Sequence, residues 1–82
     1  NLGKVKLYPN PADSYITVEN PQSIALDKMV IYDLNGRKVM DMDLVNYSQG
    51  QHIDISKLEA AQYFAMIRSK ANGTVVKRFI KE

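Results

Sequence analysis

The sequence predicts an all-β domain of about seven short antiparallel strands, a sandwich or a barrel. Short segments rich in β-branched and aromatic residues recur at roughly 8–12-residue spacing, with turn residues between them. Asn35-Gly36 and Asn72-Gly73, the dipeptides most typical of tight hairpins, each separate two such segments. The best run of helix formers, residues 57–62, covers only about one and a half turns, too short to be stable alone.

Turn residues between apolar runs give the expected limits of the strands. The strands are residues 4–7, 14–19, 28–33, 37–42, 50–55, 62–69 and 74–80. A type I′ turn needs positive φ at both central residues, which Asn-Gly tolerates, so we expect this turn at Asn35-Gly36 and at Asn72-Gly73. Strands 28–33 and 37–42 should then be antiparallel neighbours, and so should strands 62–69 and 74–80.

Alternation within these segments predicts which side chains share a face of the sheet. The expected sets are Ile16 with Val18, Ile53 with Ile55, and Tyr63 with Ala65 and Ile67. Residues 29–32 are apolar on both faces, so period alone does not assign their sides.

Composition excludes several classes of protein. The 82 residues suit one domain, and with no cysteine there is no disulfide or thiolate metal site. A net charge of +2 is too small to indicate nucleic acid or an anionic membrane as partner. No apolar run reaches the ~20 residues that span a bilayer, so no transmembrane segment is expected. The chain begins at Asn1 without a methionine or a signal peptide, and we therefore expect it to be part of a longer protein.

Candidate catalytic and metal-binding residues are few. The one histidine, His52, lacks a nucleophile in a suitable motif, and we expect no enzyme activity. Four aspartates could suggest a Ca²⁺ site, and a weak one stays open: Asp33, Asp41, Asp43 and Asp54. Asp33 is better explained as a turn residue whose carboxylate accepts from the following backbone amides. The glycosylation sequons at Asn46 and Asn72 are interpreted as accidental matches in turns.

Four motifs follow one another along the chain. The first, residues 7–11, is a rigid corner, because proline fixes φ and donates no hydrogen bond. The others are residues 31–39, residues 53–63 and the basic-apolar end at 75–81. Over nearly the whole chain this set closely resembles the C-terminal sorting domain of cargo proteins of the type IX (Por) secretion system of Bacteroidetes. The motif residues are Tyr8, Pro9, Asn10, Pro11, Asp33, Gly36, Arg37, Leu58 and Tyr63.

The resemblance implies an immunoglobulin-like β-sandwich of about seven antiparallel strands, with residues 1–3 as the end of a linker and residues 4–82 as the sorting domain. It favours Met29 and Ile31 as inward residues, which leaves Val30 and Tyr32 as an exposed apolar strip. Tyr8 and Tyr63 occupy core positions of the family, so only Tyr32 and Tyr47 are candidates for exposure. The family usually has glycine where this chain has Ala61; if φ is positive there, alanine costs about 1 kcal/mol.

The resemblance implies that the domain is a secretion signal of its parent protein. The parent protein would cross the inner membrane and this domain would fold in the periplasm. Components of the type IX translocon and its shuttle would then recognise it without a cofactor. A cysteine-protease-like sortase would remove it at the cell surface, upstream of Val5, often joining the cargo to anionic lipopolysaccharide.

The end of the chain carries the expected recognition residues Lys77, Arg78, Phe79, Ile80 and Lys81. They could act through side chains or by addition of a partner strand, while the lysines also discourage edge-to-edge aggregation. The alternative function is an Ig-like or fibronectin-like adhesion or carbohydrate-binding module, for which the tyrosines would form a sugar-stacking platform.

Overall fold

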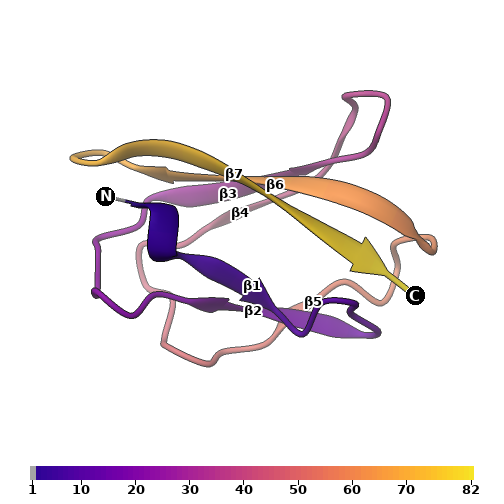
Figure 1. Ribbon diagram of the computed structural model, residues 1–82, viewed down its shortest axis with the longest axis horizontal. Coiled ribbons are helices and arrows are strands. Elements are labelled where there is room, and N and C mark those ends of the chain that lie inside the picture. Colours follow the sequence, from indigo (N-terminus) through magenta and orange to yellow (C-terminus); the bar gives the residue numbers. More distant parts are fainter. Residues whose placement is uncertain (1) are drawn as a thin grey trace.

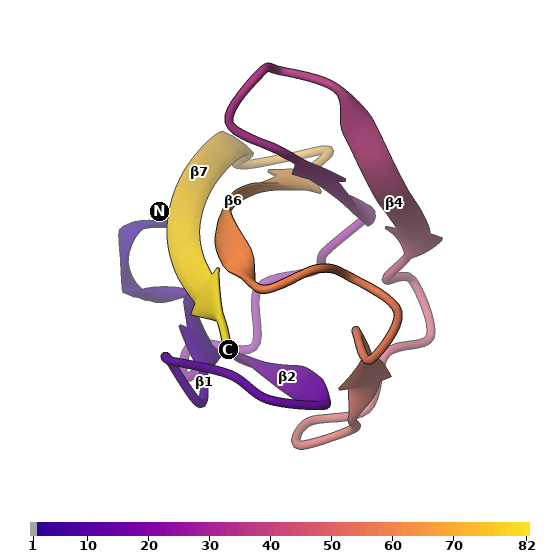
Figure 2. The same cartoon turned by 90° about the vertical axis from the view of Figure 1, so that its right-hand side faces the viewer.

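A computed structural model describes residues 2–82 as two antiparallel sheets packed face to face (Figure 1). One sheet has the order β1-β2-β5, formed by β1 (Lys6–Tyr8), β2 (Tyr15–Glu19) and β5 (Ile53–Asp54). The other has the order β4-β3-β6-β7, formed by β4 (Lys38–Asp43), β3 (Lys28–Tyr32), β6 (Ala61–Ser69) and β7 (Gly73–Lys81). A single 3₁₀ turn, η1 (Leu2–Lys4), precedes β1. Seen from the side, β7 and β6 lie opposite β1 and β2 (Figure 2).

The strand prediction is confirmed, and the largest differences in the limits of the strands concern the first and the fifth. All seven expected segments form strands, and the pairs β3–β4 and β6–β7 are antiparallel neighbours as expected. The first strand begins at Lys6 because residues 2–4 form the 3₁₀ turn. The fifth shrinks to two residues, because Gln51 N donates to the Ser48 carbonyl at 2.9 Å and folds the preceding segment into a turn.

The core lies between the sheets and follows the predicted alternation. The four-stranded sheet contributes five fully buried side chains to the core: Met29, Ile31, Ala65, Ile67 and, from its edge strand β7, Phe79. The opposite sheet contributes the predicted pairs Ile16 with Val18 and Ile53 with Ile55. Tyr63 stacks on Phe79 with ring centroids 5.6 Å apart.

The expectation that Val30 is exposed was wrong. Val30 faces away from the core but is only 3% exposed, because it lies between Asp41 of β4 and Met66 of β6. Tyr32, two residues along the same face, is half-buried. The outer face of this sheet therefore buries its own central side chain.

The type I′ turns were also wrong. Gly36 (φ 81°) and Gly73 (φ 84°) have positive φ, but among residues 2–82 the one non-glycine residue that does is Ser23. Gly36 N donates to the Asp33 carbonyl at 3.0 Å, and Asp33 N to the Arg37 carbonyl at 2.9 Å. This is a longer hairpin turn closed by a glycine in the left-handed region, which needs positive φ at one position only.

Ala61 is not strained. Its φ is not positive, and it is the first residue of β6, opposite Lys81 of β7. The turn before β6 therefore accepts alanine where the family usually has glycine, without the backbone cost that a left-handed residue would carry.

Candidate recognition surface

The expected recognition residues divide between the two faces of β7. Phe79 is fully buried and Lys81 is 8% exposed, so both belong to the inner face. Lys77 shares that face, and its Nζ donates to the Gly3 carbonyl at 3.0 Å. Arg78 and Ile80 point outward, and Ile80 is 47% exposed. The structure thus brings two of the five residues to one solvent-facing surface.

The outward residues of β7 continue an apolar row across the sheet. Val76, 58% exposed, lies in register with Met66 and, beyond it, Val30. Arg78 lies in register with Phe64 and Tyr32. We define the outer strip as the side chains that these rows expose together with the end of β7: Tyr32, Phe64, Met66, Val76, Arg78 and Ile80. Tyr32 of β3 and Arg78 of β7 thus lie in one row across the sheet, with Phe64 of β6 between them.

Charges around the outer strip are largely paired. Lys38 Nζ lies 3.0 Å from Asp41, which raises the pKa of Lys38. Arg68 contacts Asp27 at 2.5 Å and holds the pKa of that carboxyl below its usual value. Arg78 makes no ion pair with any residue in the described part of the chain. The strip therefore carries a cation without an acidic partner among apolar side chains.

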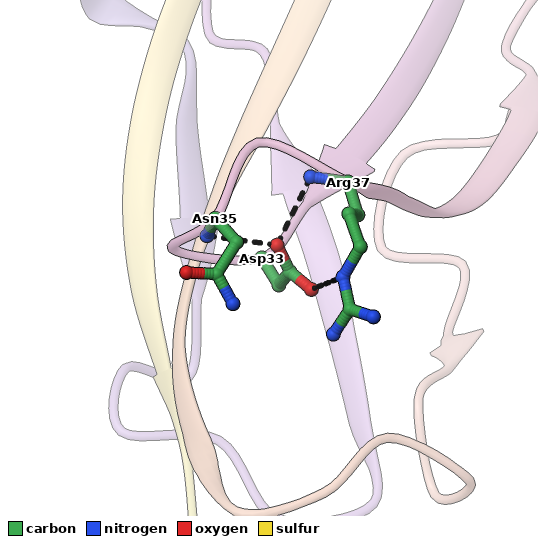
Figure 3. Close-up of polar contacts among 3 residues, drawn as sticks. All are labelled: Asp33, Asn35 and Arg37. Carbon is green, nitrogen blue, oxygen red and sulfur yellow. Dashed lines mark hydrogen bonds and ion pairs between the residues drawn. The ribbon is translucent and has the colours of Figure 1, made fainter.

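The motif residues at the β3–β4 turn form a local network (Figure 3). Asp33 Oδ1 accepts from Asn35 N at 2.9 Å and from Arg37 N at 3.0 Å, as expected for a turn residue. Its Oδ2 accepts from Arg37 Nε at 2.9 Å. These bonds, the Arg37 backbone bond foremost, hold the pKa of Asp33 below its usual value. Asp33, Gly36 and Arg37 thus hold the turn together.

Leu58 and Tyr63 complete the motif beside this turn. Leu58 packs against the core, and the Tyr63 hydroxyl donates to the Glu59 carbonyl at 2.7 Å. Burial raises the pKa of Tyr63. A surface hollow of about 430 Å³ lies here, lined by Asp33, Arg37, Leu58 and Tyr63 among others. These motif side chains are used in internal bonds and packing.

The opening corner lies on the edge of β7. Asn10 contacts the β7 backbone, and both proline peptide bonds, Tyr8-Pro9 and Asn10-Pro11, are cis. Sequence reasoning missed this contact, although an asparagine held between two prolines could have indicated a special role for its side chain.

The two expectations for exposed tyrosines were reversed. Tyr8, expected in the core, is 42% exposed. Tyr47, expected to be a candidate for exposure, packs against the core instead. Its hydroxyl accepts from Val18 N at 2.8 Å and donates to the Gln51 carbonyl, and burial raises its pKa.

The remaining candidates for chemistry are dispersed. His52 stacks on Tyr15 with ring centroids 3.6 Å apart. Asp54 accepts from Ser56 N and Asp43 from Val45 N, both at 2.8 Å, so each carboxylate organises its own turn. Within residues 2–82, no three side chains of His, Asp or Glu gather as a metal site would require, and no helix has the length and apolarity to cross a membrane.

In a comparison with known protein families, residues 6–82 match the secretion system C-terminal sorting domain. The chain belongs to this family. No curated protein matches it. The resemblance seen in the motifs is confirmed, and the β-sandwich agrees with it. A sorting domain of type IX secretion interacts with that machinery and implies export to the cell surface or the extracellular space.

Proposed function

We propose that this sorting domain directs its parent cargo through the type IX outer-membrane translocon and is recognised through the outer strip. In this proposal the domain folds in the periplasm, contacts the translocon and its shuttle without a cofactor, and has no catalytic role. A cysteine-protease-like sortase then removes it at the cell surface. Family membership supports the export step, and the outer strip supports the mode of recognition.

The observation that carries the proposal is Arg78. This side chain lies between Val76 and Ile80 on the outer face and has no acidic partner among residues 2–82. Arginine and large apolar side chains are typical of the centres of protein interfaces, because a planar cation pairs well with a carboxylate once water is excluded. The partner surface that fits is apolar and carries a carboxylate opposite Arg78.

Side-chain recognition is favoured over addition of a partner strand at the end of β7. Ala12 N donates to the Ile80 carbonyl at 2.7 Å, and Glu82 N to the Ala12 carbonyl at 2.8 Å. The backbone groups that a partner strand would need at this end are therefore occupied within the domain. The side chains of the outer strip remain accessible.

The burial of η1 suggests where the sortase acts. Leu2 is 4% exposed and Val5 1% exposed, and both belong to the core cluster. A protease needs an accessible, extended segment, and buried, packed backbone does not supply one. We therefore place the cleaved bond upstream of Leu2. The linker assignment of residues 2–3 stays a prediction, and residue 1 lies outside the described residues.

A single charge reversal tests recognition. Residues 1–82 are fused behind a signal peptide and a reporter in a host with type IX secretion, and the exported fraction is measured. We expect Arg78→Glu to reduce export strongly while the unfolding free energy changes by ~0.5 kcal/mol or less, as is usual for surface substitutions. Deleting β7 would be uninformative, because it removes Phe79 from the core.

Lys70→Glu is the matched control for this test. It makes the same change of charge at an exposed position in the β6–β7 connection, outside the outer strip. Export should remain at the level of the unchanged domain. Normal export of Arg78→Glu, or equal loss in both variants, would show that recognition does not depend on the outer strip.

A further inference from the structure

The free edge of β7 is closed by a short parallel ladder at its C-terminal end. In a parallel pair, one residue donates to the carbonyl before its partner residue and accepts from the amide after it. Ala12 does this around Lys81: its N–H donates to the Ile80 carbonyl and its carbonyl accepts from Glu82 N. This bridge fixes the last residues of the strand.

The Asn10 side chain repeats the same pattern one step earlier. Its Nδ2 donates to the Arg78 carbonyl at 3.2 Å, and its Oδ1 accepts from Ile80 N at 3.0 Å. These are the groups before and after Phe79, as the Ile80 and Glu82 groups flank Lys81. The spacing agrees, since Asn10 and Ala12 are two residues apart, as are Phe79 and Lys81. The carboxamide therefore supplies one rung of a parallel ladder in place of a backbone.

The chemistry of the corner explains why a side chain does this. Pro9 and Pro11 have no N–H, so the backbone on either side of Asn10 cannot donate to β7. A carboxamide offers a donor and an acceptor in the same arrangement as a peptide group. An ionised aspartate would offer acceptors only and would place a negative oxygen against the Arg78 carbonyl.

We propose that Asn10 is a positioning residue for recognition: its carboxamide stands in for a neighbouring strand and fixes the backbone from which Arg78 and Ile80 project. The inference rests on the proposed function, because it concerns the same two outward residues. Asn10 holds the carbonyl of Arg78 and the amide of Ile80, so it controls the direction of both side chains. It does so from a position 68 residues away from Arg78 in the sequence.

The first measurement is amide hydrogen exchange of the folded domain by NMR. In Asn10→Ala the Ile80 amide loses its acceptor, and we expect its exchange to accelerate by about tenfold, the effect of one lost hydrogen bond on local opening. Amides in the β3–β6 pairing should change no more than global stability does. The Asn10 side-chain amide protons should themselves exchange slowly in the unchanged domain. An unchanged Ile80 exchange rate would overturn the inference.

The second measurement is export of the same variants as reporter fusions. Export of Asn10→Ala should fall roughly tenfold. Misplaced Arg78 and Ile80 side chains would weaken the affinity for the export machinery by about a factor of ten. Asn20→Ala is the matched control: the Asn20 carboxamide also bonds a backbone amide and carbonyl, both of Ile24, at 3.1 and 2.7 Å. Asn20 lies between β2 and β3, outside the outer strip. The Asn20→Ala domain should therefore lose a similar amount of stability but be exported normally.

Asn10→Asp is a second variant, which retains the acceptor for Ile80 N but replaces the donor to the Arg78 carbonyl by a negative oxygen. Its export should also fall, and normal export of both Asn10 variants would overturn the inference. Arg78→Glu separates the two proposals. If it blocks export while the Asn10 variants are exported, the positioning role fails alone; if it is exported normally, the proposed recognition surface fails with it.

Discussion

The two sides of the four-stranded sheet differ in what their residues do. On the inner side, Met29, Ile31, Ala65, Ile67 and Phe79 are fully buried in the core. The other sheet faces this side, and within residues 2–82 no helix or strand covers the outer side (Figure 1), where Val76 and Ile80 stay exposed. Because side chains alternate along a strand, β7 serves both sides at once. The inner residues hold the fold, and we propose that the outer ones are read by a partner.

Most motif residues hold the fold together through its turns, its strand edge and its core. Asp33 and Arg37 bond within the turn, Gly36 supplies its positive φ, and Tyr63 is buried beside Phe79. Asn10 binds the edge of β7. We propose that most motif residues serve the fold, while contact with the machinery uses Arg78 and Ile80 on the outward face of the last motif.

The sharpest test of this comparison is a pair of adjacent residues. Phe79→Ala removes a ring that is fully buried and stacked on Tyr63, and we expect it to lower the free energy of unfolding by ~3–5 kcal/mol. Ile80→Ala, one residue on, should cost much less because Ile80 is 47% exposed. Chemical denaturation followed by circular dichroism measures both. Similar losses would show that the outer face is as important to the fold as the inner one.

A second test concerns the turn that joins β3 to β4. Gly36→Val should lower the free energy of unfolding by ~1–3 kcal/mol, because a β-branched residue is strongly disfavoured at the observed φ of 81°. A Cβ at this position would meet no atom within 4 Å, so the loss would come from the backbone and not from a clash. Gly36→Asn is the control and should cost less, since asparagine tolerates this conformation. Equal denaturation midpoints for Gly36→Val and the unchanged domain would contradict the assigned turn.

The strand segments, the two hairpin pairings and much of the core could be predicted because they depend on local periodicity and turn residues, whereas the order of the strands in the two sheets was not predicted. The alternation of Tyr63, Ala65 and Ile67 with outward residues is visible in the sequence, and so is the glycine that closes each hairpin. The number of turn residues could not be predicted from Asn-Gly alone. This dipeptide suits both a two-residue turn, with positive φ at both residues, and a longer turn, with positive φ at the glycine only. Phe79 and Lys81 were grouped with Arg78 because a run of residues does not show which face packs on the core.

Contacts between distant segments account for the rest. Val30 was expected to be exposed, but its neighbours Asp41 and Met66 come from two other strands and bury it. The position of Tyr8 likewise depends on the path of the corner after it. The pairing of Asn10 with β7 joins residues about seventy positions apart, so the two prolines beside Asn10 do not reveal that β7 is its partner.

The smallest expected effect is a dependence of stability on acid pH. Internal bonds lower the pKa of Asp33 in the folded domain, the Arg37 backbone bond most of all. Its contribution to stability is therefore fully present above the unfolded value of ~3.9 and is lost as pH falls through the lower folded value. The unchanged domain should melt at a higher temperature than Asp33→Asn near neutral pH, and this difference should shrink below about pH 4. Thermal denaturation over a pH series measures it, and the subtraction removes the parallel contributions of Asp27 and Asp54, whose pKa values are also lowered. A difference that stays constant to the lowest pH would mean that the charge of Asp33 does not stabilise the turn. In that case the motif would stabilise this turn only through the backbone conformation of Gly36. The difference between the inner and the outer face of the sheet would then rest on packing and not on charge.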